Sequence, residues 1–403
     1  MTPARRKLAG DLACLFCFLF CIIAFYPGTM SPDAVYQLAQ ARAGSFTDWH
    51  PPLMAAVWGV LDRVIPGPFG MLLLQNAMFW GALFIFWRMT DRLSLIAIGF
   101  VPATLTQLSS ILKDVHLGVA LLLAAALLYV AQRTNRKAAL LLSIPLLFYG
   151  YAVRANAAPA VLPLAIWTGF LAFRGRRFLP AIAGVAYFAL LTIGVLATTR
   201  MLTGGRSLYI EQALLLHDLT AISKARGEPL FPAYIVNDAH FSFERAAKAY
   251  TPERALPLIW RATGERAPLL WTDDPRNIAS LRAKWREVVP ANPEKYLRHR
   301  WRAFRLATGL RASPSCAQPL FLKGFVWLLL SFALLCRALV RRLRGDFELV
   351  FVLSLSGFLY GIAYFFIAPA CTFRFFWWTA VASLVALCFA IYQPLPTSEN
   401  PAQ

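Results

Sequence analysis

Residues 10–26 form the apolar run GDLACLFCFLFCIIAFY, which the turn Pro27-Gly28 follows at once. A run of about this length is close to the minimum that an α-helix needs to cross a bilayer. Comparable runs recur along the chain of 403 residues, of which 59% are hydrophobic and only 15% are charged. So little polar surface does not suffice to solvate a protein of this size in water. The sequence therefore predicts an all-α polytopic membrane protein.

Apolar runs that are largely free of charge predict about ten transmembrane helices. The predicted spans cover residues 10–26, 70–86, 93–111, 115–132, 138–151, 157–173, 178–199, 319–340, 349–369 and 373–392. About seven of them form a transmembrane core over residues 1–199, which includes the first outer loop 27–69. In residues 200–318, the helical spacing of apolar residues predicts a small, mainly helical domain outside the membrane. Residues 319–403 hold the remaining spans and a short cytoplasmic tail.

Short basic clusters give the predicted orientation, because Lys and Arg near the ends of spans stay on the cytoplasmic side. All of these clusters fall on one side of the predicted membrane: Arg5, Arg6, Lys7, Arg88, Arg92, Arg133, Arg136, Lys137, Arg174, Arg176, Arg177, Arg337, Arg341, Arg342 and Arg344. We therefore expect a multi-pass protein of the inner (plasma) membrane with both termini in the cytoplasm. The loop 27–69, the turn near Arg154 and the segment 200–318 then face outward.

The first predicted outer loop concentrates side chains that a simple connection does not need. It contains SPDAVYQ at residues 31–37 and DWHPPL at residues 48–53. Acids, an imidazole and aromatic rings held against the outer face of a membrane suit chemistry on a polar substrate that a lipid carries.

A basic stretch at residues 284–311 contributes to the net charge of +20. Two interpretations of it stay open: residues 292–310 form an amphipathic helix lying on anionic headgroups, or they form a basic wall that attracts a lipid phosphate or pyrophosphate. Membrane lipids are expected partners in both. Nucleic acid is not an expected partner, because the charge is spread over two membrane faces without a recognisable binding module.

The chain contains seven cysteines, and their spacing fits no metal-binding pattern. Cys316 and Cys371 both fall near the predicted outer boundary, in an oxidising compartment, so a disulfide between them is left open.

These motifs resemble those of the GT-C superfamily of integral-membrane glycosyltransferases, in particular its bacterial branch of dolichyl-phosphate-mannose-like and aminoarabinose-transferase-like enzymes. The resemblance rests on Asp33, Tyr36, Asp48, His50 and Pro51-Pro52-Leu53, and more faintly on Lys113-Asp114, Arg154-Ala-Asn156 and Arg374. It implies a GT-C-like fold and transfer of a hexosyl or pentosyl group from a polyprenyl-phosphate donor to an envelope glycolipid, polysaccharide or protein. One departure is Ala34, which stands where many relatives have a second carboxylate.

Such a transfer needs a base for the acceptor proton. Asp33 is the predicted base, although Ser31 and Asp33 also fit the start of a helix, and the two roles are compatible. Asp48 and His50 are predicted to orient the acceptor or to hold a divalent metal ion, and a structural turn fixed by the two following prolines is the alternative. The resemblance leaves the use of a metal ion open.

The transfer also needs cations that stabilise the departing phosphate. Lys113, Arg154 and Arg374 are predicted to do so, because each lies at the outer end of a predicted span. Tyr36 and Asn156 are further predicted substrate-binding residues. The alternatives are that Arg374 snorkels beside its aromatic neighbours and that Lys113 forms an ion pair with the next residue.

A transporter or flippase of a lipid-linked or anionic solute is the competing class of protein, and a non-enzymatic envelope assembly protein is a third. We find no convincing internal repeat of the kind that transporters carry. The ionisable residues gather at the ends of the predicted spans, which favours chemistry at the membrane surface over passage through it.

Overall fold

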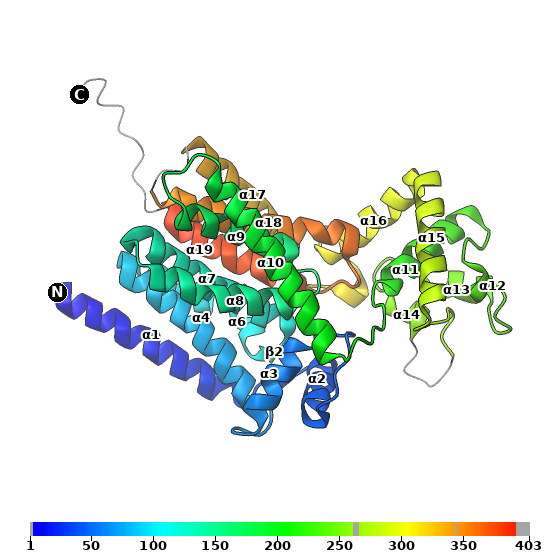
Figure 1. Cartoon of the computed structure of the whole chain (residues 1–403), viewed down its shortest axis with the longest axis horizontal. Coiled ribbons are helices and arrows are strands. Elements are labelled where there is room, and N and C mark those ends of the chain that lie inside the picture. Colours follow the sequence, from blue (N-terminus) through cyan, green and yellow to red (C-terminus); the bar gives the residue numbers. More distant parts are fainter. Residues whose placement is uncertain (1–2, 261–265, 342, 344, 392–403) are drawn as a thin grey trace.

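The structure is a computed structural model that describes residues 3–260, 266–341, 343 and 345–391. These residues are mainly helical, and the strands among them, β1 (Thr29–Met30) and β2 (Ser110–Ile111), form one short parallel pair. The predicted all-α class is confirmed. A bundle of long helices fills the left of Figure 1, and a group of shorter helices, α11 to α16, lies on the right. We call these parts the bundle and the helical domain.

The bundle contains the helices that are apolar enough to lie in a membrane: α1 (Pro3–Phe25), α4 (Phe69–Thr90), α7 (Lys113–Thr134), α8 (Lys137–Ala152), α9 (Ala158–Ala172), α10 (Leu179–Leu202), α17 (Gly324–Val340), α18 (Phe347–Ile367) and α19 (Trp377–Ile391). Within the described residues, six helical stretches are long enough to cross a bilayer, namely those of α1, α4, α7, α10, α18 and of α19 with the short helix before it. The remaining α8, α9 and α17 are apolar but shorter. A long helix therefore lies at every predicted span except residues 93–111.

The predicted span at residues 93–111 is wrong as a single helix. The chain there forms α5 (Ser94–Ala97), η1 (Ile98–Phe100) and α6 (Pro102–Leu108). Pro102 begins α6, because its ring fits the first turn of a helix but not its interior. Gly99 lies against the ring of Trp80 midway along α4, and Gln75, in the second turn of α4, donates a 2.8 Å hydrogen bond to the Leu108 carbonyl. The broken segment thus runs alongside α4 in the opposite direction.

The first predicted outer loop folds into α2 (Pro32–Ala43) and α3 (Leu53–Asp62) at the end of the bundle nearest the helical domain. We call this end the domain end. Ser31 caps α2 by accepting a 3.2 Å hydrogen bond from the Ala34 amide, and Gly44 ends the helix in the left-handed conformation with φ 62°. The expected helix start is confirmed. Because Ser31 serves as the cap, the Asp33 carboxylate in the first turn is left for other partners.

The helical domain comprises α11 (Gln212–Arg226), α12 (Ala233–Val236), α13 (Phe243–Ala249), α14 (Leu256–Ile259), α15 (Pro275–Ala291) and α16 (Pro293–Ala307). It buries a hydrophobic cluster of its own around Leu216, Leu219 and Leu281. Backbone contacts attach it to the link after α18, where the Ala255 amide donates a 3.1 Å hydrogen bond to the Pro369 carbonyl.

A disulfide joins the segment after α16 to the segment after α18. It connects Cys316 to Cys371, the pairing that the sequence left open, with the two Cα atoms 6.0 Å apart. The chain that carries Arg374 is therefore tied covalently to the end of the helical domain.

Candidate functional site

Charged side chains from five parts of the chain meet at the domain end of the bundle. They come from the first turn of α2, the loop before α3, the start of α7, the turn between α8 and α9, and the 3-10 helix η4 (Phe373–Phe376). The members of this charged cluster are Asp33, His50, Lys113, Asp114, Arg154 and Arg374. Five of them were predicted from the sequence, each because it lies at the end of an apolar run or in the first loop.

Asp33 and Arg374 form the ion pair at the more open side of the cluster. Arg374 Nη1 donates a 2.9 Å hydrogen bond to Asp33 Oδ2, and both side chains are about one quarter exposed. Burial by itself raises the pKa of the Asp33 carboxyl, but Arg374, followed by Lys113, outweighs it and holds the pKa below its ordinary value. Asp33 is therefore ionised at neutral pH and is able to accept a proton.

His50 and Lys113 form a buried pair next to Asp33. Lys113 Nζ lies 2.6 Å from His50 Nδ1, and His50 Nε2 faces Asp33 Oδ1 at 3.9 Å. Burial, with the charge of Lys113 as the second cause, lowers the pKa of His50 to about 3, so the imidazole is neutral. With an ammonium donor at Nδ1, the ring proton resides on Nε2 and points toward the carboxylate. This pair positions a donor beside Asp33.

Arg154 and Asp114 form the deepest ion pair of the cluster. Arg154 Nη2 lies 3.1 Å from Asp114 Oδ1, and the Asp114 side chain is only 1% exposed. Arg154 also donates a 3.2 Å hydrogen bond to the hydroxyl of Tyr364 on α18, and Tyr364 and Tyr360 share a 3.1 Å hydrogen bond. A buried arginine that is held by a carboxylate and a phenol has a fixed guanidinium plane, which suits it to receive a planar or tetrahedral oxyanion.

Three residues that belong to the charged cluster or contact it, Asp114, Tyr360 and Tyr364, were not predicted as site residues from the sequence. Asp114 follows Lys113 directly and pairs with Arg154, and more distantly with Arg374 at 3.8 Å, rather than with its neighbour. An acid at the start of an apolar span is a signal that could have singled it out. Tyr360 and Tyr364 carry no such signal, because two aromatic residues spaced by four are common in a membrane helix.

Asp48 does not join the cluster. Ser207 Oγ donates a 2.5 Å hydrogen bond to its Oδ2, and the Leu208 amide donates a 2.7 Å hydrogen bond to its Oδ1. Asp48 thus anchors the chain where it enters the helical domain. Among the described residues, neither Asp48 nor His50 belongs to a group of three His, Cys, Asp or Glu ligand atoms that lie within 4.8 Å of one another, so the alternative in which these two residues hold a divalent metal ion finds no ligand set there.

The other two predicted residues lie beside the cluster. The ring of Tyr36 packs edge-on against His50, with centroids 5.8 Å apart, and its hydroxyl lies 3.3 Å from Thr47 Oγ1. Asn156 follows Arg154 in the turn between α8 and α9, and its Nδ2 is buried without a hydrogen-bond partner in the described part of the chain. An unpaired buried amide is costly, so this donor is available to a ligand.

A cavity of about 220 Å³ leads from Arg154 toward α10. Its polar lining includes Arg154, Asp48 and Glu211, while Tyr151 and Leu196 belong to its apolar lining. Only 17% of the apolar stretch of α10 is buried in the structure, as expected for a helix that faces lipid. The cavity therefore combines a buried cation with an apolar wall that opens at a lipid-facing helix.

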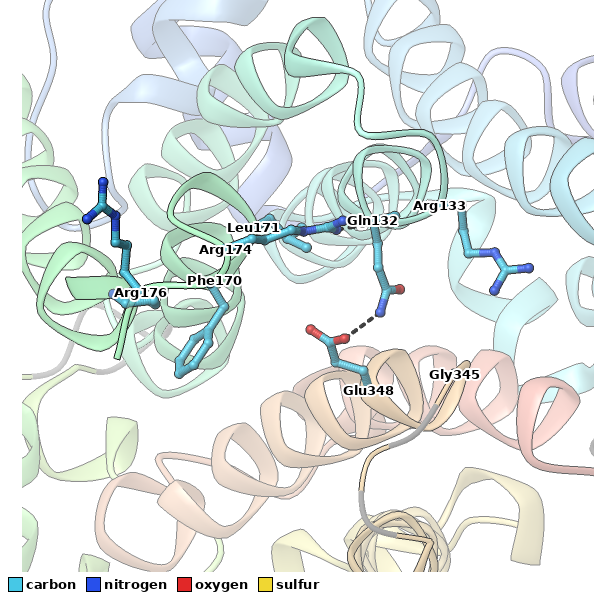
Figure 2. A pocket seen from close by; sticks show the side chains of 10 residues that line it. Gln132, Arg133, Phe170, Leu171, Arg174, Arg176, Gly345 and Glu348 are labelled. Carbon is cyan, nitrogen blue, oxygen red and sulfur yellow. Dashed lines mark hydrogen bonds between the residues drawn. The ribbon is translucent and has the colours of Figure 1, made fainter. Parts of the chain in front are cut away.

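A larger cavity, of about 570 Å³, lies at the opposite end of the bundle (Figure 2). Gln132 and Trp167 donate hydrogen bonds of 2.5 Å and 2.7 Å to Glu348 there, and exposed arginines, Arg133, Arg174 and Arg176, surround it. None of the side chains predicted to bind or transform a substrate lines this cavity. The chemistry expected from the sequence is gathered at the domain end.

No protein-family model matches the chain, and no curated protein and no solved structure matches it either. The resemblance to the GT-C superfamily rests on the motifs of the first loop and on the residues at the ends of the spans.

Proposed function

We propose that this protein is a membrane glycosyltransferase that moves a sugar from a polyprenyl phosphate to an envelope glycolipid, polysaccharide or protein. The observation that carries the proposal is the meeting of one ionised carboxylate, Asp33, with the cations Lys113, Arg154 and Arg374 at one end of an apolar helix bundle. A sugar phosphate of a membrane lipid presents its reacting bond at this height.

In the proposed reaction, Asp33 takes the proton from an acceptor hydroxyl as its oxygen attacks the anomeric carbon. The bond from that carbon to the phosphate oxygen breaks, and the polyprenyl phosphate leaves with the bonding electrons. Arg154 and Arg374 stabilise the charge that develops on the departing phosphate. The three cations of the cluster exceed its two carboxylates, Asp33 and Asp114, by one positive charge, which favours an anionic ligand.

The cavity beside Arg154 supports the proposal that the sugar donor is a lipid. Its apolar wall offers space for the first isoprene units, while Arg154 lies where the phosphate would follow. The proposed topology places this end of the bundle on the outer face of the inner membrane and both termini in the cytoplasm. It keeps about ten crossings in a GT-C-like arrangement, with residues 93–111 crossing as short broken helices rather than as one helix.

A transporter or flippase of a lipid-linked or anionic solute is the second candidate. Two observations favour it: the broken segment from α5 to α6, and the Asp114–Arg154 pair, which is buried among apolar helices. Such a protein would move its ligand across the bilayer without altering it, whereas a transferase makes a new glycosidic bond.

The deciding experiment compares envelope lipids, polysaccharides and proteins from cells with and without the protein by mass spectrometry. The proposal expects one component to lose the mass of a single hexose or pentose, together with accumulation of a polyprenyl-phosphate sugar. Restoring the protein should restore the product. An unaltered set of glycoconjugates, with the lipid-linked sugar redistributed between the leaflets, would instead establish the flippase.

A further inference from the structure

The helical domain contains a basic groove between α11 and α16, apart from the charged cluster. The groove has a volume of about 460 Å³. On α16 it is lined by residues spaced by three and four positions, which places them on one face of the helix: Lys295, Arg298, His299 and Arg302. The facing wall comes from α11, where Ala221 and Ala225 are small enough to leave the space open.

The groove carries an excess of positive charge. Lys224 contributes a fourth cation from α11, and the one carboxylate of the lining, Glu294, is paired with Arg298. Lys295 and Arg302 make no ion pair or hydrogen bond with any residue that the structure describes. Cations that converge on a cavity without local partners favour an anion that several of them contact together.

The floor of the groove is hydrogen-bonded and neutral. Tyr250 forms a 2.7 Å hydrogen bond with Nδ1 of His299, whose side chain is almost fully buried. Burial lowers the pKa of His299 below its ordinary value, so the imidazole adds no charge at neutral pH. Behind it, Asp218 is held by Arg300 at 2.6 Å and by Trp285 at 2.9 Å. The buried acid is thereby neutralised and does not oppose an anion in the groove.

The position of α16 places the groove close to the membrane. Phe304, near the end of α16, packs against Phe365, near the end of α18, with ring centroids 5.7 Å apart. Since a helix rises about 1.5 Å per residue, Arg302 and Lys295 lie at most about 3 and 14 Å beyond that contact. Distances of about 3 to 14 Å beyond the end of a membrane helix include the headgroup layer. Trp301, about half exposed on the neighbouring face of α16, suits the same interface.

We propose that this groove binds the phosphate group of an anionic headgroup at the membrane surface. Of the two interpretations of this basic stretch, the structure therefore favours the basic wall, because α16 buries His299, Arg300 and Phe304 against the protein instead of lying free on lipid. The site is separate from the charged cluster and does not depend on whether the protein transfers a sugar.

The test uses the full chain in detergent with a fluorophore on Ala225→Cys, whose position lines the groove and is exposed. Cys336→Ser removes the one exposed free cysteine of the described residues. Glycerol 3-phosphate and dihexanoyl phosphatidic acid are titrated as phosphate-bearing probes, and glycerol and dihexanoylglycerol serve as probes without phosphate. We expect a saturable fluorescence change with the phosphate-bearing probes alone.

In the double variant Lys295→Ala/Arg302→Ala, the dissociation constant should rise at least roughly tenfold, the loss of one charge-assisted contact or more. The matched control Arg276→Ala/Arg286→Ala removes two exposed cations of α15 that do not line the groove and should bind as the parent does. A response to both probes identifies the phosphate alone as the ligand, and a response to phosphatidic acid alone identifies a lipid headgroup. Equal affinity in the double variant and its parent, or a response to the probes without phosphate, overturns the proposal.

Discussion

The Asp33 carboxylate lies 2.9 Å from the Arg374 guanidinium, although 341 positions separate the two residues in the sequence. The contact joins the first turn of α2 to η4, the segment that the disulfide Cys316–Cys371 ties to the helical domain. It couples the predicted base to a predicted phosphate ligand, so a phosphate that draws Arg374 toward itself leaves Asp33 freer to accept a proton.

This pair predicts a shift in the pH dependence of transfer. Asp33 works as a base only when ionised, and its pKa is held low chiefly by Arg374 against the opposing effect of burial. Activity should therefore be lost only as the pH falls through that low value. In Arg374→Ala, the effect of burial is less opposed, so the acid limb of the kcat/KM profile should move to higher pH. Arg374→Lys should give an intermediate profile, and Arg286→Ala should leave the limb in place.

Arg154 is predicted to act on donor affinity. A charge-assisted hydrogen bond to phosphate contributes about 1.5–3 kcal/mol, so Arg154→Ala should raise the apparent KM for the lipid donor by roughly 10- to 150-fold. Arg154→Lys should restore part of the affinity, because an ammonium lacks the planar fork. Unchanged donor dependence in Arg154→Ala, with the protein still folded, would limit Arg154 to pairing with Asp114.

The packing of α9 on α10 predicts that position 169 accepts only glycine. A Cβ atom at Gly169 would lie 2.4 Å from both the Gly184 nitrogen and the Pro180 carbonyl oxygen, which are backbone atoms. Gly169→Ala should therefore destabilise the protein by about 1–3 kcal/mol in thermal unfolding of the purified protein. Gly81→Ala, at a helical glycine with open space around it, should unfold at the temperature of the parent.

The helices could be predicted because an apolar run is a local property of the sequence. The same property failed at residues 93–111, where hydropathy stays high while Pro102 and the contact of Gly99 with Trp80 break the helix. A break of this kind depends on the neighbour that the glycine meets, which no local pattern reveals.

The candidate site was predictable to the extent that its residues lie at the ends of spans. Lys113, Arg154 and Arg374 share that property, and the structure brings them together. Asp48 lies in an equally suggestive motif, yet its carboxylate holds Ser207 and Leu208. Which of two acids in one loop faces the cations depends on partners more than a hundred residues away.

The proposed topology predicts which cysteines a membrane-impermeant thiol reagent can reach. Arg276→Cys lies on α15 in the helical domain, Arg136→Cys lies before α8 at the end of the bundle away from that domain, and both positions are exposed. In a Cys336→Ser background, intact spheroplasts should label the first variant and not the second, because the positive residues near Arg136 stay in the cytoplasm. Labelling of Arg136→Cys alone would show that the orientation in the membrane is the opposite of the one proposed.

Asp33→Asn tests the central residue of the proposed function. The amide keeps the size of the side chain and can still contact Arg374, but it cannot take a proton from the acceptor. Sugar transfer should fall by roughly 100- to 10,000-fold, while membrane insertion and protein level stay normal. Asp273→Asn is the matched control, because this exposed acid of the helical domain lies outside the charged cluster and should leave transfer unchanged.

Comparing Asp33→Asn with Asp48→Asn also discriminates between the two acids of the first loop as the base. Asp48→Asn loses an acceptor for Ser207 or Leu208 and should lower stability more than it lowers kcat, since its carboxylate holds the chain at the entry to the helical domain. If Asp33→Asn kept transfer near the parent level and Asp48→Asn abolished it in a folded protein, the base would be Asp48. If both variants stayed active, a carboxylate base in this loop would be excluded, and the flippase, which needs no proton acceptor at this position, would become the better account of the cluster.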